Sequence, residues 1–360
     1  MKVAVLGVGL IGGSIGLAAR ESVEGAEVVG FDVDRDALAA ASKRGAIHSA
    51  AGSVAEALEG AAACFACAPV RALPGLCGEA LGAAQEDCVV SDVGSTKRHL
   101  ASLYSDERFV GGHPIAGSEA AGVGHARADL FAGAPWYLTP GERSAGLLYE
   151  RLFRLVQTLG AQPLAIDAET HDRLLAAVSH LPHVMANVLV SQAAHALSEE
   201  SEAIPRVGPS FRDSTRVAGA SSAIWTDIYA SNSAAITAEI DAVLARLQTA
   251  RDMIADGDTA ALTDWNEAAR ADRRRLHQDE LTGGGPVHEL HVSVPNRPGV
   301  LAQVALALGR ARVNIVDMAL APAPDMKTGS IDLWVAGDED AERSRLLIAE
   351  LGFPVASAGP

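Results

Sequence analysis

The chain has 360 residues, which is enough for two or three domains that each bury a core. Apolar residues make up 49% of it and charged residues 21%, as is usual for soluble globular proteins. The formal net charge of −16 argues against binding to nucleic acid or to an anionic membrane surface, so local cations must hold any anionic ligand.

The first part of the chain alternates strand and helix patterns. Lys2–Leu6 and Glu27–Phe31 are short apolar strands, and helical patterns follow them at Ile11–Arg20 and Arg35–Arg44. Further strand patterns continue the series at Ala62–Ala68, Cys88–Ser91 and Arg108–Gly111. Short apolar strands separated by helices predict a doubly wound α/β domain with a mainly parallel sheet, which we place at residues 1–143.

Long helical patterns dominate residues 144–281. Leu174–Leu197 is apolar on nearly every side, which predicts burial all round, in part within a subunit interface. More apolar residues recur at helical spacing between Ile236 and Ile254. This apolar surface exceeds what a monomer leaves exposed, so we expect an all-α domain that forms a homodimer.

The tail of the chain has a third pattern. Leu281–Pro286 is typical of a linker. Within residues 287–360, strands are expected at Glu289–Val294, Ile315–Ala321, Ser330–Val335 and Pro354–Ala358, and helices at Val300–Ala311 and about Ala341 to Leu351. The order βαββαβ predicts a ferredoxin-like fold.

The apolar run after Met1 faintly resembles a secretory signal. Five glycines interrupt it, however, and no small-residue cleavage site precedes Arg20 and Glu21. No other segment has the roughly 18 uninterrupted apolar residues of a membrane span. We therefore expect a cytoplasmic protein that binds no membrane.

Four cysteines are present, and two of them form a CxxC pair. Cys64 and Cys67 lie in an apolar strand pattern, where residues three apart point to opposite faces. Such a pair cannot chelate one ion, so we interpret the cysteines as buried reduced thiols and expect no metal site.

The first strand is followed by the spacing Gly7-x-Gly9-x-x-Gly12, which opens the first helix. Gly7 allows the tight turn, Gly9 the approach of a pyrophosphate, and Gly12 close packing of helix on strand. The backbone N–H groups of Leu10 and Ile11 lie at the helix N-terminus and suit an anion. The context on both sides predicts a Rossmann-like dinucleotide site.

An acidic residue, Asp32, ends the second strand 20 residues after Gly12. Its carboxylate would accept hydrogen bonds from the adenosine ribose and repel a 2′-phosphate. This favours NAD over NADP, although the nearby Arg35 keeps NADP open.

Two motifs lie near the ends of later strands, where such folds bind ligands: DVGSTK at Asp92–Lys97 and GGHPIAGSE at Gly111–Glu119. His113, between glycine and proline, lies on a constrained turn. It is either a structural turn histidine or a general base that works near neutral pH.

Two more clusters lie in the helical region. One combines His171-Asp172 with SHLPH at Ser179–His183, and the other is FRDSTR at Phe211–Arg216. His180 and His183 share one helix face, but no HExxH pattern is present, so a zinc site is not expected. A satisfied core histidine also fits one of the two, His180.

Together these motifs resemble the prephenate dehydrogenase family. GVGLIGGS at Gly7–Ser14, DVGSTK, GGHPIAGSE, SHLPH and RDSTR occur in family order over roughly residues 1–280. GGHPIAGSE and SHLPH are far more specific than the glycine fingerprint alone. The tail is similar to an ACT domain, with PNRPGVL at Pro295–Leu301 and Asn314 before its second strand.

The resemblance implies NAD-dependent oxidation of the ring C4 alcohol of prephenate with loss of the ring carboxylate, which gives 4-hydroxyphenylpyruvate for tyrosine synthesis. It implies that His113 takes the hydroxyl proton and that Ser95 helps to hold that hydroxyl. Arg216 would bind a substrate carboxylate, although Arg212 remains a rival for this role. The other expected substrate-binding residues are His183, His180, Asp172, Asp213 and Ser118.

The ACT-like tail implies feedback control by an amino acid, for which tyrosine is the natural candidate. Its ligand turn would comprise Asn296, Pro298 and Gly299, with Asn314 nearby. A dimerising module that binds nothing is an equal alternative.

Three rival functions remain open. Arogenate dehydrogenase acts on the same ring carrying an amino acid side chain. A generic β-hydroxyacid or imine reductase would need a catalytic Lys or Asp in the helical region and leaves GGHPIAGSE unexplained. A regulator that senses NAD and an amino acid predicts binding without turnover, and the lack of a DNA-binding motif weakens it.

Overall fold

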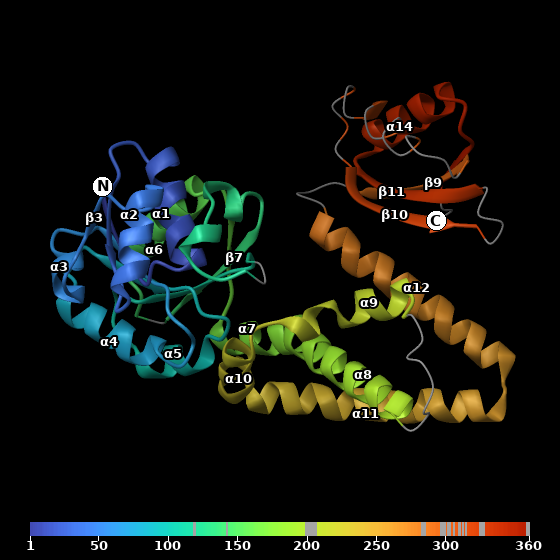
Figure 1. Cartoon of the computed structure of the whole chain (residues 1–360), viewed down its shortest axis with the longest axis horizontal. Helices are drawn as coiled ribbons and strands as arrows, with labels where there is room; N and C mark the ends of the chain where they lie inside the picture. The colour runs from blue at the N-terminus through green and yellow to red at the C-terminus, as the bar shows by residue number, and fades with distance from the viewer. Residues whose placement is uncertain are drawn as a thin grey trace. The chain divides into compact units, whose positions relative to one another are not determined.

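The computed structural model describes the chain except for residues 118–119, 142, 199–206, 282–285, 296–299, 301–303, 305–306, 309–310, 312, 314, 324–327 and 358–360. The chain forms two compact units, Met1–Leu247 and Gln248–Pro360 (Figure 1).

A five-stranded parallel sheet forms the centre of the first unit, with strand order β3-β2-β1-β4-β5. Its strands are β1 (Lys2–Leu6), β2 (Glu27–Phe31), β3 (Ser49–Ala50), β4 (Ala63–Ala66) and β5 (Val89–Asp92). The helices between them are α1 (Leu10–Ser22), α2 (Arg35–Arg44), α3 (Val54–Leu58), α4 (Leu73–Ala83) and α5 (Arg98–Leu103). The predicted Rossmann-like architecture is confirmed.

Both faces of this sheet are buried, because successive residues of each strand point to opposite sides. Val3 and Val5 of β1 pack in one apolar cluster with α1 and α2, while Ala4 and Leu6 pack in a second with α3 and α4. Burial on both faces explains why these strands are uninterrupted apolar runs.

A second, three-stranded sheet continues from the first. It contains β6 (Val110–Pro114), β7 (Pro135–Pro140) and β8 (Gln162–Ala165); β6 and β7 are antiparallel, and β7 and β8 are parallel. A parallel bridge between Val90 and Phe109 links β5 to the start of β6. The strand expected at Arg108–Gly111 therefore belongs to a mixed sheet and not to the parallel series.

The helix α6 (Gly146–Thr158) shows that the expected boundary at residue 143 lies too early. Its apolar residues Leu148, Leu152 and Leu155 pack in the same cluster as Val3 and Val5 of β1. The apolar face of α6 needs this partner. The first domain therefore includes α6 and β8.

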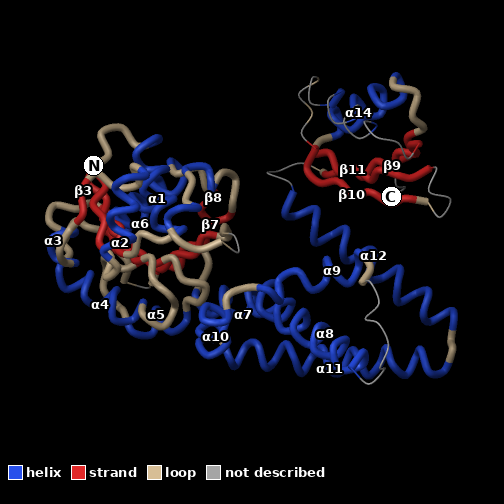
Figure 2. Tube along the Cα trace, in the orientation of Figure 1, coloured by secondary structure: helices blue, strands red, loops and turns tan. Residues whose placement is uncertain are grey.

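The helical region follows β8. It comprises α7 (Ala168–Leu175), a π-helical turn (Ala176–His180), α8 (Leu181–Ser198), α9 (Pro209–Thr215), a 3-10 turn (Arg216–Gly219), α10 (Ser222–Ser231), α11 (Ser233–Asp256) and α12 (Thr259–Leu281). Figure 2 shows that the described part of this region consists of helices joined by short loops.

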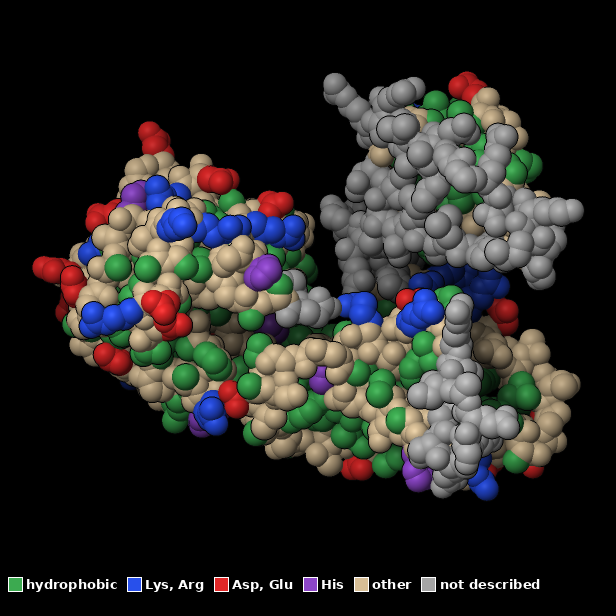
Figure 3. All heavy atoms as spheres, in the orientation of Figure 1, with side chains coloured by type: hydrophobic (Ala, Val, Ile, Leu, Met, Phe, Trp, Pro, Cys, Tyr) green, Lys and Arg blue, Asp and Glu red, His purple; other side chains and the backbone are tan. Residues whose placement is uncertain are grey.

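Leu174–Leu197 is not buried on all sides within one chain, so its predicted burial depends on the subunit interface that the prediction included. Val178 and Val188 are 60% and 53% exposed, and Leu189 and Val190 are each 40% exposed. Figure 3 shows hydrophobic side chains gathered on the surface of this region. The continuous helical stretch Ala168–Ala196 is also long and apolar enough to cross a membrane by length and composition alone. An apolar surface of this kind requires a partner.

The second unit contains a four-stranded antiparallel sheet in the order β10-β11-β9-β12. Its strands are β9 (Val287–Pro295), β10 (Ile315–Pro322), β11 (Thr328–Ala336) and β12 (Val355–Ser357), and α14 (Asp338–Glu350) precedes β12. Leu290, Val292, Leu333 and Ile348 form its core. All four strand predictions are confirmed, whereas the helix expected at Val300–Ala311 lies largely outside the described residues.

Candidate active site

The turn between β1 and α1 has the shape of a phosphate cradle. Gly7 has a φ of +96°, and a Cβ there would lie 2.1 Å from the Cys67 carbonyl oxygen. A Cβ on Gly12 would lie 1.9 Å from the carbonyl oxygen of Gly7. At Gly9, in contrast, a Cβ would meet no described atom within 4 Å. Two glycines are thus required for packing, and the third leaves the backbone open to a pyrophosphate.

The carboxylate of Asp32 lies at the edge of this cradle. It accepts hydrogen bonds from the N–H groups of Val8 at 2.8 Å and Asp34 at 2.9 Å. Asp32 also lines a pocket together with Val33, Arg35 and Gly52. The carboxylate is therefore held next to the glycine-rich turn, where the prediction placed an adenosine ribose.

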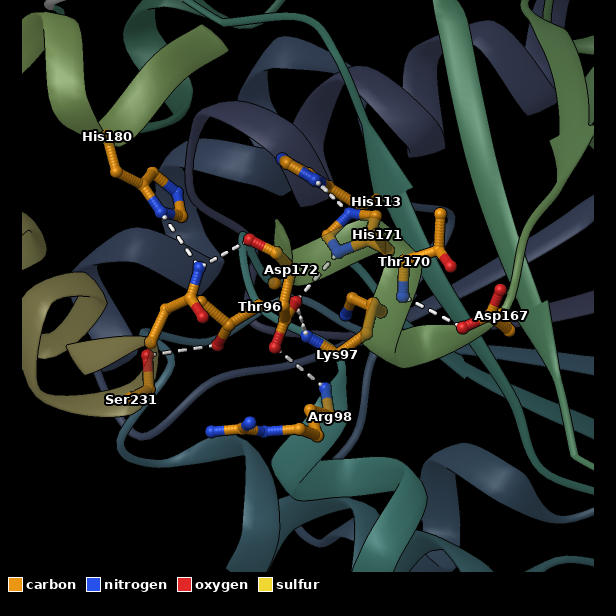
Figure 4. A network of polar contacts seen from close by, with 12 residues as sticks. Thr96, Lys97, Arg98, His113, Asp167, Thr170, His171, Asp172, His180 and Ser231 are labelled. Atoms are coloured by element: carbon orange, nitrogen blue, oxygen red, sulfur yellow. Dashed lines mark hydrogen bonds and ion pairs between the residues drawn. The ribbon is translucent and has the colours of Figure 1, made fainter. Parts of the chain in front are cut away.

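A chain of three buried side chains lies at the carboxyl end of the sheet (Figure 4). The Nδ1 atom of His113, on β6, lies 2.9 Å from Nε2 of His171, on α7. The Nδ1 atom of His171 lies 2.8 Å from Oδ1 of Asp172. A carboxylate can only accept, so His171 donates from Nδ1, and Nε2 of its neutral ring accepts from His113. His113 then carries its proton on Nδ1, and its Nε2 has a lone pair for a substrate proton.

Asp172 anchors this chain and is 2% exposed, and its predicted part in forming the substrate pocket stays a prediction. Its carboxylate accepts from the N–H of Lys97 at 2.7 Å and of Arg98 at 3.0 Å, at the N-terminus of α5. Burial raises the pKa of Asp172, but hydrogen bonds from His171 and these two N–H groups outweigh it and hold the pKa below its usual value. Asp172 therefore stays ionised and orients His171.

Burial lowers the pKa of His113 well below its ordinary value, and the nearby His171, Lys97 and His180 lower it further. The physical cause is that a protonated imidazole would lose its hydration beside other cationic groups. His113 is therefore neutral at physiological pH, which is the state that a general base requires.

The two histidines of SHLPH have different surroundings. His180 is 1% exposed, and its Nδ1 lies 3.2 Å from the side-chain nitrogen of Asn232, which also donates to the backbone oxygen of Asp172 at 2.7 Å. Burial lowers the pKa of His180 to about 4. His180 is therefore held in the core next to His171 and Asp172, which agrees with the alternative prediction that it is a satisfied core histidine.

His183 faces an aromatic group instead. Its ring stacks on that of Trp225 with centroids 3.6 Å apart, and its Nδ1 bonds to the hydroxyl of Tyr229. Asn187 lies within 3.3 Å of both polar atoms. This arrangement fixes the ring plane of His183 through Trp225 and Tyr229, both of which come from α10.

The other expected site residues are less closely connected. Ser95 is half-buried in the loop between β5 and α5. Arg212 and Asp213 on α9, and Arg216 on the following turn, are exposed, and the described contacts do not join them to His113. Ser118, and the expected effector residues Asn296, Pro298, Gly299 and Asn314, lie outside the described residues.

Sequence reasoning missed several residues that organise the site. Lys97 and His171 stand in motifs that were recognised, but neither was assigned a role. Trp225 and Tyr229 had only a hydrophobic helical pattern as a signal. Asn232 had no signal in the sequence, because its function depends on contacts with segments about fifty residues away.

A dinucleotide cradle and, in the same unit, a neutral histidine oriented through a second histidine by a carboxylate are typical of a nucleotide-dependent dehydrogenase. Two family models match the chain: prephenate dehydrogenase, nucleotide-binding domain, at residues 15–164, and prephenate dehydrogenase, dimerization domain, at residues 167–267. The prephenate dehydrogenase of Bacillus subtilis is 30% identical over 349 residues, which covers 95% of this chain and 94% of that protein. The chain belongs to the prephenate dehydrogenase family.

Solved structures agree with this assignment. Prephenate dehydrogenase from Aquifex aeolicus, in complex with hydroxyphenyl propionate and NAD⁺, has a TM-score of 0.69 at 27% identity and covers 77% of this chain and 98% of that one. Arogenate dehydrogenase from Synechocystis has a TM-score of 0.67 at 25% identity, with coverages of 77% and 100%. Both neighbours therefore match over nearly their entire length.

Proposed function

We propose that this chain is an NAD-dependent prephenate dehydrogenase, which oxidises the C4 alcohol of the ring and releases the ring carboxylate as carbon dioxide to give 4-hydroxyphenylpyruvate. The observation that carries the proposal is the hydrogen-bonded chain from Asp172 through His171 to His113, which belongs to the same unit as the glycine-rich turn. The chain supplies a neutral base and the turn a dinucleotide cradle, and oxidation of an alcohol with NAD requires both.

In this mechanism the turn Gly7–Gly12 would hold the pyrophosphate of NAD, with the backbone at Gly9 open to it, and Asp32 would accept hydrogen bonds from the ribose. NAD supplies the hydride acceptor when bound. Nε2 of His113 takes the proton of the C4 hydroxyl of prephenate. The positive charge that then develops on the imidazole of His113 is stabilised through His171 by the carboxylate of Asp172. Ser95 helps to hold the hydroxyl. Release of carbon dioxide and aromatisation of the ring make the step irreversible.

The two carboxylates of prephenate need cations in a protein of overall negative charge. Arg216 is our candidate, with Arg212 as the rival, because a guanidinium binds a carboxylate through two parallel hydrogen bonds. His183, with its ring plane fixed by Trp225, is positioned to contact the substrate ring or its side chain. Asp213, His180 and Ser118 complete the proposed pocket, His180 through packing.

Initial rates of NADH formation test the function, with prephenate and arogenate offered separately and with NAD or NADP. Fast turnover of prephenate with NAD supports the proposal. A preference for arogenate, the substrate that names the Synechocystis neighbour, would keep the mechanism and change the substrate. If folded, NAD-saturated protein turns over neither compound, the enzyme assignment fails, and a generic reductase or a sensor of NAD and an amino acid replaces it.

We propose that the protein is a cytoplasmic homodimer and that the exposed apolar residues of α8 contribute to its interface. Val188, Leu189 and Val190 are exposed on α8, and the matching family domain is described as a dimerization domain. The same helix carries His183 in a polar and aromatic cluster, which favours a protein partner over lipid. Light scattering on purified protein tests the proposal: a dimer without detergent supports it, and a monomer or a need for detergent contradicts it.

Within the second unit, residues 287–360 are proposed to form an ACT-like regulatory domain that binds tyrosine. With β9 as the first strand, its antiparallel sheet has the order 4-1-3-2 that a βαββαβ ferredoxin-like fold requires. Inhibition by tyrosine, reversed in an Asn296→Ala variant, tests the effector site. If tyrosine neither binds nor inhibits, the unit serves only for association.

A further inference from the structure

A fully buried ion pair lies beneath the active site and has no role in the mechanism above. Asp92, the last residue of β5, pairs with Lys97, the first residue before α5, and both side chains are 0% exposed. Burying two charges costs several kcal/mol of hydration, and an apolar pair of similar size is often at least as stable. Stability alone therefore gives a weak reason for such a pair at this position.

The hydrogen bonds of Asp92 join three segments of the site. One carboxylate oxygen accepts from the N–H of Gly94 at 2.8 Å, at the start of the loop that carries Ser95. The other oxygen accepts from the N–H of Gly112 at 3.1 Å, on the residue immediately before His113. The carboxylate thus ties the serine loop to the strand that carries the histidine.

Lys97 connects the same segments to the helical region. Its ammonium pairs with Asp92, while its backbone N–H donates to Oδ1 of Asp172 at 2.7 Å. That same carboxylate oxygen holds His171, which in turn holds His113. A single residue therefore contacts both the pair beneath the strand and the carboxylate that orients the base.

The packing around the pair leaves little room for movement. A Cβ on Gly111 would lie 2.3 Å from the side-chain oxygen of Thr139 and 3.3 Å from Cδ of Lys97. A Cβ on Gly112 would lie 2.6 Å from the backbone oxygen of Asp92. The two glycines before His113 thus lie directly against the ion pair, and a shift of the pair moves the strand.

We propose that Asp92 and Lys97 form a positioning pair for the reaction, which fixes Ser95 and His113 relative to each other and places a fixed ammonium where it disfavours the protonated form of His113. This inference rests on the proposed function. The charge of Lys97 is one of the causes that lower the pKa of His113, after burial and His171. The other titratable groups around the base are Asp92, Asp172, His171, His180 and Tyr137.

Three variants separate positioning from folding. Lys97→Met removes the ammonium at similar length, and the double variant Asp92→Asn with Lys97→Met removes both charges while keeping an acceptor for one glycine N–H. Arg108→Met is the matched control, because it removes a less buried ion pair, with Asp106, from the same domain. Binding of NAD and the melting temperature show whether each variant is folded.

We expect kcat of Lys97→Met with prephenate to fall by about a hundredfold, the cost of a small misplacement of reacting groups, while the KM for NAD stays unchanged. The acid limb of its kcat/KM profile should move to higher pH, because removal of a nearby cation raises the pKa of His113. The double variant should also have a lower kcat than the wild type. The acid limb of its kcat/KM profile should, however, lie nearer to that of the wild type. Arg108→Met should behave as the wild type.

Titration of the His113 ring by NMR keeps this test independent of turnover. If the wild type converts neither substrate, the proposed function fails, but a rise in the pKa of His113 in Lys97→Met would still support the ammonium's role. A folded Lys97→Met protein with wild-type kcat, pH profile and His113 titration would overturn the inference. If that variant does not fold, a double variant with wild-type kcat would overturn it.

Discussion

The two sides of the proposed substrate pocket differ in how complete they are within one chain. On the base side, His113, His171 and Asp172 are buried and joined by short hydrogen bonds to one another and to the start of α5. On the anion side, Arg212 and Arg216 are exposed on α9 and the turn after it. The difference suggests that proton transfer is preorganised by the fold, whereas the carboxylate contacts form when substrate or a second subunit is present.

The largest expected effect comes from removing the base. His113→Ala should lower kcat with prephenate by about 10²–10⁴-fold, because it removes the group that takes the hydroxyl proton in the proposed mechanism. Binding of NAD should be unchanged, since the glycine-rich turn and Asp32 belong to other segments. Stopped-flow and steady-state rates measure the loss. Turnover within a factor of about three of the wild type would show that the preorganised side does not act in the reaction.

The next largest effect tests the anion side of the pocket, where Arg212 or Arg216 is proposed to bind a carboxylate of the substrate. Arg216→Gln should weaken prephenate binding by about 1.5–3 kcal/mol, the usual value of a hydrogen bond to a charged group, and so raise KM by roughly 10- to 100-fold. The pH profile should not change, because Arg216 is not part of the histidine chain.

Arg212→Gln is the matched variant, since Arg212 lies four residues away and is also exposed. If KM rises in Arg212→Gln and not in Arg216→Gln, the carboxylate role passes to Arg212. If neither variant changes KM, the exposed arginines do not form the anion side at all.

The same contrast separates what the sequence could predict from what it could not. The bounds of α2 match the predicted Arg35–Arg44, because Asp34 caps its start and Gly45, with a φ of +76°, ends it. Such signals are local, so a single sequence carries them. The strands β3, β7 and β8 were missed: β3 has two residues, β7 begins and ends with proline, and β8 is a strand of four residues that lies between helices.

Within the site, motifs identified the chemistry but not the direction in which side chains point. The pair His171-Asp172 was recognised, yet the contact of His171 with His113 joins residues 58 positions apart. For the same reason the sequence did not reveal that Asp172 accepts hydrogen bonds from the start of α5. Long-range pairing of this kind is fixed by packing, which a single sequence does not display.

A third effect sharpens the description of the cofactor pocket. Asp32→Ser should reduce the preference for NAD over NADP by about tenfold, because it removes a charge that repels a 2′-phosphate and an acceptor for the ribose hydroxyls. The ratio of kcat/KM with the two cofactors measures it. Asp34→Ser, which changes the cap of α2, is the control and should leave that ratio unchanged. If Asp32→Ser leaves this ratio of kcat/KM values unchanged, the adenosine ribose does not bind next to Asp32.

The smallest effect concerns His180, the histidine that supports the base side by packing. Burial lowers its pKa to about 4, against an ordinary value of 6.5, so the unfolded chain takes up this proton first as the pH falls. The contribution of neutral His180 to the unfolding free energy is complete above pH 6.5 and is lost as the pH falls toward 4. In His180→Gln, the loss of unfolding free energy between pH 7 and pH 5.5 should therefore be smaller than in the wild type by about 1 kcal/mol. Urea titrations at both pH values measure it, and an equal change in unfolding free energy in the two proteins would mean that folding does not lower the pKa of His180.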